Sequence, residues 1–378
     1  MRRWRAALTI VVAAAAVASP SAAASHEPTD ATAALRAGLD ADLLSDPNIP
    51  GEALAVRAPG VRATLAVGLA DVEAGTPLEP DTPFRVASMT KTFVAAAVLR
   101  LVEKGELGLD DPMAKHVSEE SRSVLRVDGY DVDTITVRQL LQHTSGLFDY
   151  ADTSDYDDVN VSDPAHRWTR LEQLQFATEH GDRVGEPGEV FNYSDTGYIL
   201  LGEILERTTG KTLPAAVRSV IDFDRLGLDD TWWETLEPAP AGAPPRAHQY
   251  FGTYDNIVLD ASSDLYGGGG LVSTVADLAR FYRALFHGQV FDEPSTLRTM
   301  TKVSRAGRDE DAAMGIYEVD SAGERCFGHF GFWGTQTIYC PRLDLTFART
   351  TNQALDDFDD DPLESVIVDV VEQARRAR

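Results

Sequence analysis

Arg85-Val86-Ala87-Ser88-Met89-Thr90-Lys91-Thr92-Phe93 is the stretch around which this sequence is organised, because it places a serine three residues before a lysine. The residues that follow, up to Leu101, include neither Gly nor Pro, are rich in Ala and are apolar on nearly every side. This pattern predicts a buried helix with Ser88 at its N-terminus. Residues i and i+3 share one face of a helix, so the Ser88 hydroxyl and the Lys91 amine could reach each other.

This spacing has two interpretations. In one, Ser88 is a nucleophile, Lys91 is a desolvated base, and the free N–H groups of the first helical turn bind an oxyanion. In the other, Ser88 only caps the helix and Lys91 happens to be near. Taken alone, the motif favours the capping serine, because Ser-x-x-Lys is short enough to occur by chance.

The charge balance excludes one class of partner. The chain of 378 residues has a formal net charge of -26, from 60 acidic and 34 basic side chains. Such a surface repels nucleic acid and anionic membranes. Hydrophobic residues make up 43% of the chain, which is enough for a substantial core. We therefore expect a globular protein that has no nucleic-acid partner.

The first residues predict a secretory signal peptide over 1–24. Met1–Arg5 is basic, Ala6–Ala18 is apolar but too short to span a bilayer, and small residues follow up to Ala24. No later stretch predicts an integral membrane segment, so we expect a secreted, extracytoplasmic protein. The only cysteines are Cys326 and Cys340, and in an exported protein two cysteines are more often paired than free. A hairpin centred between them would place them opposite each other, so we expect a structural disulfide.

The order of helical and strand patterns predicts an α+β fold. Helical spacing marks both ends and the middle of the chain, at residues 29–44, 92–101, 171–177, 198–207 and 362–378. Period-two patterns mark residues 53–57, 61–68, 316–319, 325–330, 335–339 and 343–350. We expect one antiparallel sheet, flanked by the N- and C-terminal helices, in a domain of residues 25–105 and 263–378. Residues 106–262 would form an inserted, mostly helical domain.

Two stretches downstream of Ser88 carry further candidate chemistry. Phe191–Gly197 contains Tyr193-x-Asp195 and is expected in a loop before the helix that starts near Tyr198. Gly328–Thr335 contains His329-x-Gly331 on or beside a strand, where glycines would let a substrate approach the backbone.

Ser88-x-x-Lys91, Tyr193-x-Asp195 and His329-x-Gly331, in this order and at about this separation, resemble the three motifs of the penicillin-recognising serine hydrolases. That superfamily includes class C β-lactamases, D-alanyl-D-alanine carboxypeptidases, D-aminopeptidases and esterases. Leu140–Leu147 and Gly269–Thr274 agree with it, and the resemblance extends over about Asp40 to Thr351.

The resemblance implies a role for each motif residue. Ser88 would be the acylated nucleophile, Lys91 its base or proton relay, and Tyr193 the residue that deprotonates Ser88 or protonates the leaving group. Asp195, His329, Gly331 and Phe332 would form the substrate-binding and oxyanion set, with the backbone N–H groups of Ser88 and Phe332 binding the oxyanion. Acylation of Ser88 followed by hydrolysis requires neither a metal nor a cofactor.

Two positions depart from the family pattern. The second motif usually ends in asparagine, and an ionised Asp195 near Lys91 would favour the ammonium form of the lysine. Phe330 and Phe332 occupy positions where peptidases and β-lactamases commonly place hydroxyl groups that bind a substrate carboxylate. This departure argues against a strong β-lactamase and favours ester or uncharged amide substrates.

We therefore expect a secreted serine hydrolase nearest to the D-alanyl-D-alanine carboxypeptidase and class C β-lactamase group, acting on a cell-wall peptide, a β-lactam or an ester. An esterase is the main alternative, and a non-catalytic binding or sensor domain is the second. Other features are expected to be ordinary: the acidic runs Asp149–Asp158 and Asp356–Asp361 as solvated segments, and His143 and His248 as polar residues. Trp232-Trp233 could line a cleft or pack in the core.

Overall fold

A seven-stranded antiparallel sheet joins the two ends of the chain in this computed structural model, which describes residues 30–354 and 362–378. The predicted signal peptide and the run Asp356–Asp361 lie outside these residues. The strand order is β3-β2-β1-β12-β11-β10-β9, and the direct pairing of β1 with β12 connects the early strands to the late ones. The strands are β1 (Gly51–Ala58), β2 (Val61–Asp71), β3 (Thr76–Pro77), β9 (Tyr317–Ser321), β10 (Glu324–Gly331), β11 (Thr335–Cys340) and β12 (Leu345–Thr350).

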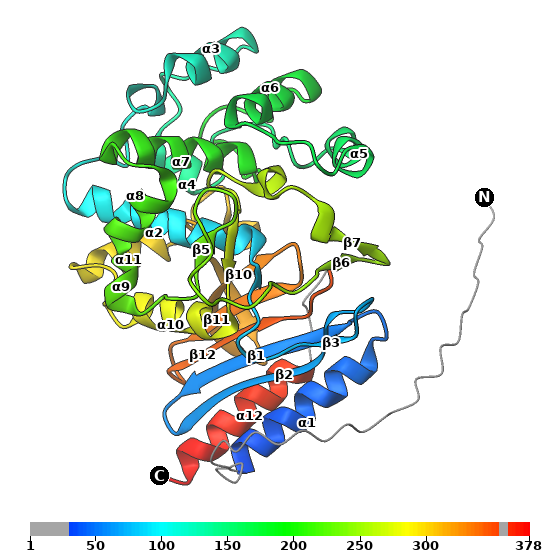
Figure 1. The fold of residues 1–378 in the computed structure, drawn as a ribbon. Coiled ribbons are helices and arrows are strands. Elements are labelled where there is room, and N and C mark those ends of the chain that lie inside the picture. The colour runs from blue at the N-terminus through cyan, green and yellow to red at the C-terminus, as the bar shows by residue number, and fades with distance from the viewer. Residues whose placement is uncertain (1–29, 355–361) are drawn as a thin grey trace.

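The two terminal helices cover one face of this sheet (Figure 1). α1 (Asp30–Ser45) and α12 (Pro362–Arg376) pack beside each other, and their leucines, isoleucine and valines contact alternate residues of the strands. Cys326 and Cys340 lie in this layer and form a disulfide, because the pairing of Phe327 with Tyr339 brings them opposite each other on β10 and β11. The predicted disulfide is therefore confirmed.

The other face of the sheet packs against the larger core. It contacts α10 (Val275–Phe286), and beyond that lies α2 (Thr90–Glu103), of which nearly every residue is buried. A small sheet of β4 (Phe84–Arg85), β8 (Leu271–Ser273) and β5 (Trp232–Trp233) lies beside the start of α2. Both tryptophans of β5 are buried, so they belong to the core and do not line a cleft.

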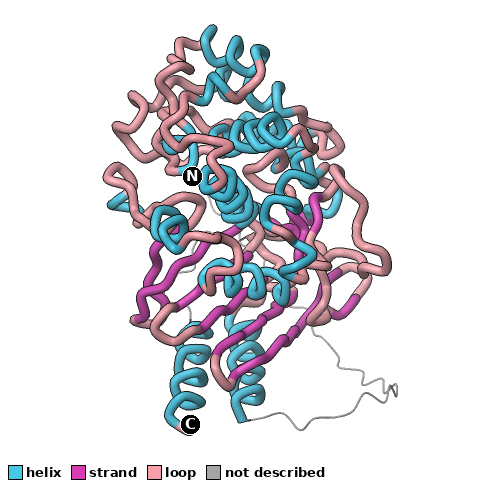
Figure 2. The backbone as a smooth tube through the Cα atoms, turned by 90° about the vertical axis from the view of Figure 1, so that its left-hand side faces the viewer, coloured by secondary structure: helices cyan, strands magenta, loops and turns pink. Residues whose placement is uncertain are grey.

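The regular secondary structure between α2 and β8 consists mostly of helices. Figure 2 shows the strands as one layer, with two helices below it and most of the others above. The α+β fold class is confirmed, while the expected domain limits at 106 and 262 stay a prediction. The remaining α-helices and short strands are α3 (Glu119–Val127), α4 (Val137–Leu141), α5 (Ser154–Ser162), α6 (Arg170–His180), α7 (Asp195–Thr209), α8 (Leu213–Ile221), α9 (Phe223–Leu226), β6 (Tyr250–Phe251), β7 (Tyr254–Asp255) and α11 (Pro294–Met300). No helix in the described part of the chain is long and apolar enough to cross a membrane.

Candidate active site

Ser88 lies in a short 3-10 turn, η1 (Ala87–Met89), that leads directly into α2. Neither η1 nor α2 has a side-chain hydrogen bond at its N-cap, so the Ser88 hydroxyl does not cap the helix. The preceding residue, Ala87, has a φ of +46°, a left-handed conformation that costs on the order of 1–3 kcal/mol for a residue with a Cβ atom. The capping interpretation of Ser88 is therefore wrong, and the backbone strain beside it is typical of a functional turn.

Lys91 points from the first turn of α2 to Ser88. Its Nζ donates to Ser88 Oγ at 2.9 Å and to the backbone oxygen of Gly268 at 2.9 Å, and it forms an ion pair with Asp195. Burial disfavours the charge on this fully buried side chain, but Asp195 and, after it, Asp264 outweigh that effect and raise the pKa of Lys91 above its ordinary value. Lys91 is therefore an ammonium ion at neutral pH, as the sequence argument about Asp195 expects.

Asp195 is the first residue of α7, and Ser194 is its N-cap, with Ser194 Oγ accepting from the Gly197 N–H at 3.4 Å. The helix thus begins three residues earlier than the expected start near Tyr198, because a capping serine outweighs the glycine that follows. A Cβ atom at Gly268 would lie 2.3 Å from Asp195 Oδ1, so only glycine fits there. The ion pair thus joins Lys91 on α2 to Asp195 on α7, and the loop at Gly268 packs against both residues.

Tyr193 lies close enough to Ser88 for the Ser88 hydroxyl to lower the pKa of the phenol. Burial, and then the charge of Asp195, raise the pKa of Tyr193 well above its ordinary value. The Ser88 hydroxyl lowers this pKa, but by less than the other two effects raise it. The Lys91 Nζ stands 4.8 Å from the centre of the Tyr193 ring. Ser88, Lys91 and Tyr193, predicted from two separate motifs, therefore meet at one point.

His143 is a site residue that the sequence interpretation missed. Its ring stacks on Tyr193 at 4.4 Å and on Tyr198 at 4.9 Å, and its Nδ1 accepts from the Ser194 N–H at 3.0 Å. Burial and then the charge of Lys91 lower its pKa well below the ordinary value, so the ring is neutral. The sequence signal for His143 is the stretch Leu140–Leu147, whose resemblance to the family places this histidine in a family-like segment.

Two further carboxylates face Lys91. Burial, and then the charge of Asp195, raise the pKa of Asp264 to about 6 and that of Asp149 well above its ordinary value. The expected solvated loop over Asp149–Asp158 is wrong in two respects: Asp149 is only 6% exposed, and α5 begins at Ser154. The other aspartates of the run are exposed, as expected. In the described residues, no group of three or more His, Cys, Asp or Glu side chains could hold a metal ion. Both carboxyl groups instead contribute to the raised pKa of Lys91.

The third motif lies on the last residues of β10. β9 pairs with β10 only as far as Gly328, which leaves His329 and Gly331 paired on the β11 side alone. Burial, and then the charge of Lys91, lower the pKa of His329 to about 3, so this imidazole is neutral. A Cβ atom at Gly331 would lie 2.3 Å from the backbone oxygen of Val86, two residues before Ser88. This close approach brings the end of β10 against the Ser88 turn.

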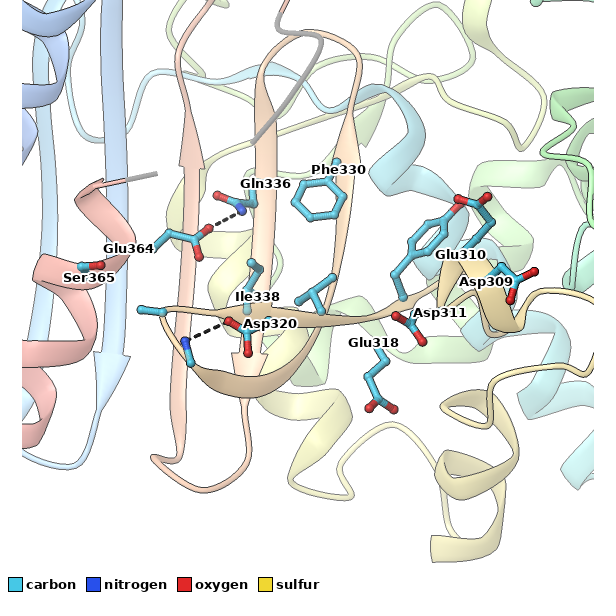
Figure 3. Close-up of a pocket in the computed structure, with 14 residues that line it drawn as sticks. Asp309, Glu310, Asp311, Glu318, Asp320, Phe330, Gln336, Ile338, Glu364 and Ser365 are labelled. Carbon is cyan, nitrogen blue, oxygen red and sulfur yellow. Dashed lines mark hydrogen bonds between the residues drawn. The ribbon is translucent and has the colours of Figure 1, made fainter. Parts of the chain in front are cut away.

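The side chain of Phe330 points away from the substrate position that the sequence predicts for it. Its side chain packs towards the layer of α1 and α12 and lines a carboxylate-rich groove, where Gln336 donates to Glu364 at 2.6 Å (Figure 3). Successive residues of a strand point to opposite faces, so Phe330 cannot share the face of its neighbour His329. Phe332 does lie at the rim, with 54% of its surface exposed. Only one of the two phenylalanines can therefore affect substrate binding.

Comparisons with known proteins agree with this geometry. A family model described as Beta-lactamase matches residues 31–372. Esterase EstB of Burkholderia gladioli is 38% identical over 192 residues, which are 47% of this chain and 45% of that protein. Penicillin-binding protein 4* of Bacillus subtilis (strain 168) is 25% identical over 302 residues, which are 73% and 62% of the two chains. The chain thus spans about half the length of these relatives.

The solved structures include one that matches almost end to end. D-amino acid amidase from Ochrobactrum anthropi SV3, crystallised with L-phenylalanine amide, superimposes with a TM-score of 0.73 at 27% identity. The match covers 92% of this chain and 99% of the amidase.

Proposed function

The chain belongs to the beta-lactamase family of serine hydrolases, and we propose that it cleaves esters and uncharged amides through an acyl-enzyme on Ser88. The observation that carries this proposal is the neutral state of His329 in the third motif. Its lowered pKa leaves the third motif without a charge that could bind a substrate carboxylate.

The other charges around Ser88 support the same substrate class. The one ammonium at Ser88, that of Lys91, already forms an ion pair with Asp195. Asp149 and Asp264 add further buried carboxyl groups near it. A substrate carboxylate would meet acidic side chains and no free cation among these residues, which disfavours its binding by like-charge repulsion.

In the proposed acylation step, Tyr193 acts as a proton shuttle. Lys91 is an ammonium ion and Tyr193 a neutral phenol, so neither holds a vacant basic site at rest. As Ser88 Oγ bonds to the carbonyl carbon, its proton passes to the Tyr193 oxygen, and Tyr193 gives its own proton to the leaving oxygen or nitrogen. The bond from the carbonyl carbon to that atom breaks, and the acyl group stays on Ser88.

Hydrolysis of the acyl-enzyme reverses the direction of the shuttle. Water attacks the acyl carbon and loses a proton to Tyr193, while Tyr193 returns its proton to Ser88 Oγ as the ester bond breaks. In both steps the backbone N–H groups of Ser88 and Phe332 would bind the oxyanion, and the Lys91 ammonium would stabilise charge on Ser88 Oγ.

The relatives divide between the candidate substrates. One is named an esterase, one a penicillin-binding protein and one a D-amino acid amidase. The carboxypeptidase and β-lactamase expectation requires recognition of a substrate carboxylate. The esterase and amide alternatives do not, and the charge distribution at Ser88 favours them.

A matched pair of substrates tests this proposal. N-acetyl-D-Ala-D-Ala carries a free carboxylate, and its C-terminal amide differs only in lacking it. We expect at least about tenfold higher kcat/KM for the amide, turnover of p-nitrophenyl acetate, and one fluorophosphonate adduct that Ser88→Ala abolishes. Faster cleavage of the free acid would overturn the proposal in favour of a carboxypeptidase. A protein with neither turnover nor adduct would be a binding or sensor domain.

We also propose that the chain is exported, with cleavage after Ala24. The disulfide between Cys326 and Cys340 supports an oxidising compartment. Expression of the full chain in a bacterial host, followed by mass spectrometry of the periplasmic fraction, tests this. A mature N-terminus near Ser25 that is lost in the Ala13→Asp variant is expected, whereas an intact cytoplasmic chain would contradict it.

A further inference from the structure

Two phenylalanines from distant segments stack on each other at the rim of the candidate site. The rings of Phe251, on β6, and Phe332, directly after β10, are 6.0 Å apart at an interplanar angle of 10°. Their side chains are nevertheless 56% and 54% exposed. The buried Trp333 also packs against Phe332, with the two ring centres 4.7 Å apart and the rings nearly perpendicular. The two phenyl rings therefore form one apolar surface that packs against a buried tryptophan and is exposed to solvent.

This surface lies beside the reacting atoms. Gly331 approaches the backbone oxygen of Val86 so closely that a Cβ atom there would lie 2.3 Å away, and Phe332 is the next residue along the chain. The Phe332 N–H is also the second oxyanion donor of the proposed mechanism. A substrate whose carbonyl oxygen accepts from that N–H would place the neighbouring part of its structure next to the Phe332 ring.

The Phe251 hairpin is tied to the segment that carries Ser88. The side chain of Gln249 accepts from the Arg85 N–H at 3.0 Å and donates to the Arg85 carbonyl at 2.9 Å. The Tyr250 N–H donates to the Asn352 carbonyl at 2.9 Å, directly beyond β12. These bonds hold the root of the hairpin at fixed distances from Ser88 and from the main sheet, so the aromatic pair is ordered before a substrate arrives.

Tyr254 extends the same surface. It pairs with Phe251 across the β6–β7 hairpin and is 38% exposed. Joined apolar side chains on a surface mark a binding site more often than scattered ones, because each exposed ring gains free energy when a ligand removes it from water. A single exposed phenylalanine would need no explanation, but a stacked pair next to the oxyanion donor does.

We propose that Phe251 and Phe332 form an apolar subsite that binds a phenyl or similarly bulky apolar group next to the scissile carbonyl of an ester or amide. This inference rests on the proposed function and names its substrate class more closely. The enzyme would prefer arylacetyl or comparable apolar acyl groups to acetyl groups.

The test compares p-nitrophenyl phenylacetate with p-nitrophenyl acetate. Phe251 is the residue to change, because its backbone takes no part in the proposed chemistry. In Phe251→Ala, we expect the ratio of kcat/KM for phenylacetate over acetate to fall about fivefold to tenfold, mainly through KM. Val127→Ala removes a 90% exposed apolar side chain on α3 and should leave the ratio unchanged. An unchanged ratio in Phe251→Ala, with acetate still hydrolysed, would overturn the subsite and leave the proposed function intact.

A binding measurement covers the case in which neither ester is hydrolysed. Calorimetry with phenylacetamide, a neutral amide that carries the phenyl group, should show weaker binding to Phe251→Ala than to the unaltered chain. Equal affinity would overturn the subsite whatever the catalytic activity. Sedimentation of both proteins tests the other occupant, a second copy of this chain. A dimer that dissociates on Phe251→Ala, together with an unchanged ester ratio, would assign the aromatic pair to self-association.

Discussion

The Lys91 ammonium donates a hydrogen bond of 2.9 Å to Ser88 Oγ, and through it the nucleophile is coupled to the buried charges of the site. Asp195 forms the ion pair with Lys91, and Asp264 and Asp149 raise the pKa of Lys91 further. The protonation state of this one amine therefore depends on carboxyl groups from three separate parts of the chain.

Asp195→Asn should lower the pKa of Lys91, because the largest favourable charge on the ammonium is removed. Lys91 then loses its proton at a lower pH, so any alkaline limb that reports Lys91 in a plot of kcat/KM against pH should move to lower pH. At pH values below that limb, the Lys91 ammonium no longer has the Asp195 carboxylate as its ion-pair partner. The ratio of kcat/KM for N-acetyl-D-Ala-D-Ala amide over that for the free acid should then fall by about tenfold.

Asp149→Asn provides the comparison for this experiment, because Asp149 raises the pKa of Lys91 less than Asp195 does. Its shift of the alkaline limb should have the same direction and a smaller size. A wider preference for the amide in Asp195→Asn would contradict the electrostatic argument.

His143 should control the orientation of Tyr193 through two separable contacts. His143→Phe can keep a ring against Tyr193 but loses the acceptor for the Ser194 N–H, while His143→Asn can keep an acceptor but loses the stacking. We expect kcat on p-nitrophenyl acetate to fall about tenfold to a hundredfold in both variants, with KM changed much less, because the phenol no longer points at Ser88. Thermal unfolding shows whether each variant is folded, and a folded variant with kcat within twofold of the original would show that the stacking has no positioning role.

Much of this site follows from local sequence patterns. The Ser88–Lys91 contact is set by three residues of spacing at the start of one helix, and the strands around His329 follow from a period of two. The opposite direction of Phe330 was also within reach of the sequence, since neighbouring strand residues alternate between faces. That alternation turns the Phe330 side chain to the face opposite His329, whereas Phe332 lies beyond the end of β10.

Other site residues could not be found in this way. Asp149 begins an acidic run that is typical of a solvated segment, and Asp264 follows two serines. Only tertiary packing buries both of them beside Lys91. His143 reaches Tyr193 because α4 ends next to the start of α7, a contact between helices that periodicity does not encode. Charge balance around a buried ammonium is a property of the folded structure.

Asp264 should give the free energy of unfolding a recognisable pH dependence. Its folded pKa of about 6 lies above the ordinary value of 3.8, so between these values the folded state holds a proton that the unfolded state has lost. The unaltered protein therefore loses stability from this group as pH rises through that window. The asparagine in Asp264→Asn does not titrate, so the variant does not lose this stability. The free energy of unfolding of the variant minus that of the unaltered protein should therefore rise by on the order of 2 kcal/mol between pH 4 and pH 7.

Urea unfolding at intervals of one pH unit measures this difference. Asp110→Asn is the control, and its effect on the pH dependence of stability should have the opposite sign. The reason is that a hydrogen bond from Arg138 lowers the pKa of Asp110, whereas the pKa of Asp264 is raised. Its stability difference should fall or stay level as pH rises. A level or falling difference in Asp264→Asn would mean that Asp264 does not hold its proton near pH 6.

The disulfide should stabilise the fold without taking part in catalysis. Cys326 and Cys340 are separated by 14 residues and lie in the apolar layer between the sheet and helices α1 and α12, away from Ser88. Closing a loop of this length stabilises a protein by about 3 kcal/mol when the loop constrains the unfolded chain. The double variant Cys326→Ala/Cys340→Ala should therefore unfold several degrees lower, and the protein with its disulfide reduced by dithiothreitol should behave similarly.

Activity below the unfolding transition should survive in this double variant. The pairing of β10 with β11 continues from Phe327 to Gly331 without help from the disulfide, so His329 and Gly331 keep their register beside the Ser88 turn. We expect kcat/KM for p-nitrophenyl acetate within about threefold of the original at 25 °C, and no further effect of dithiothreitol on the variant. A large loss of activity in a folded variant would show that the disulfide, and not strand pairing alone, sets the position of the third motif.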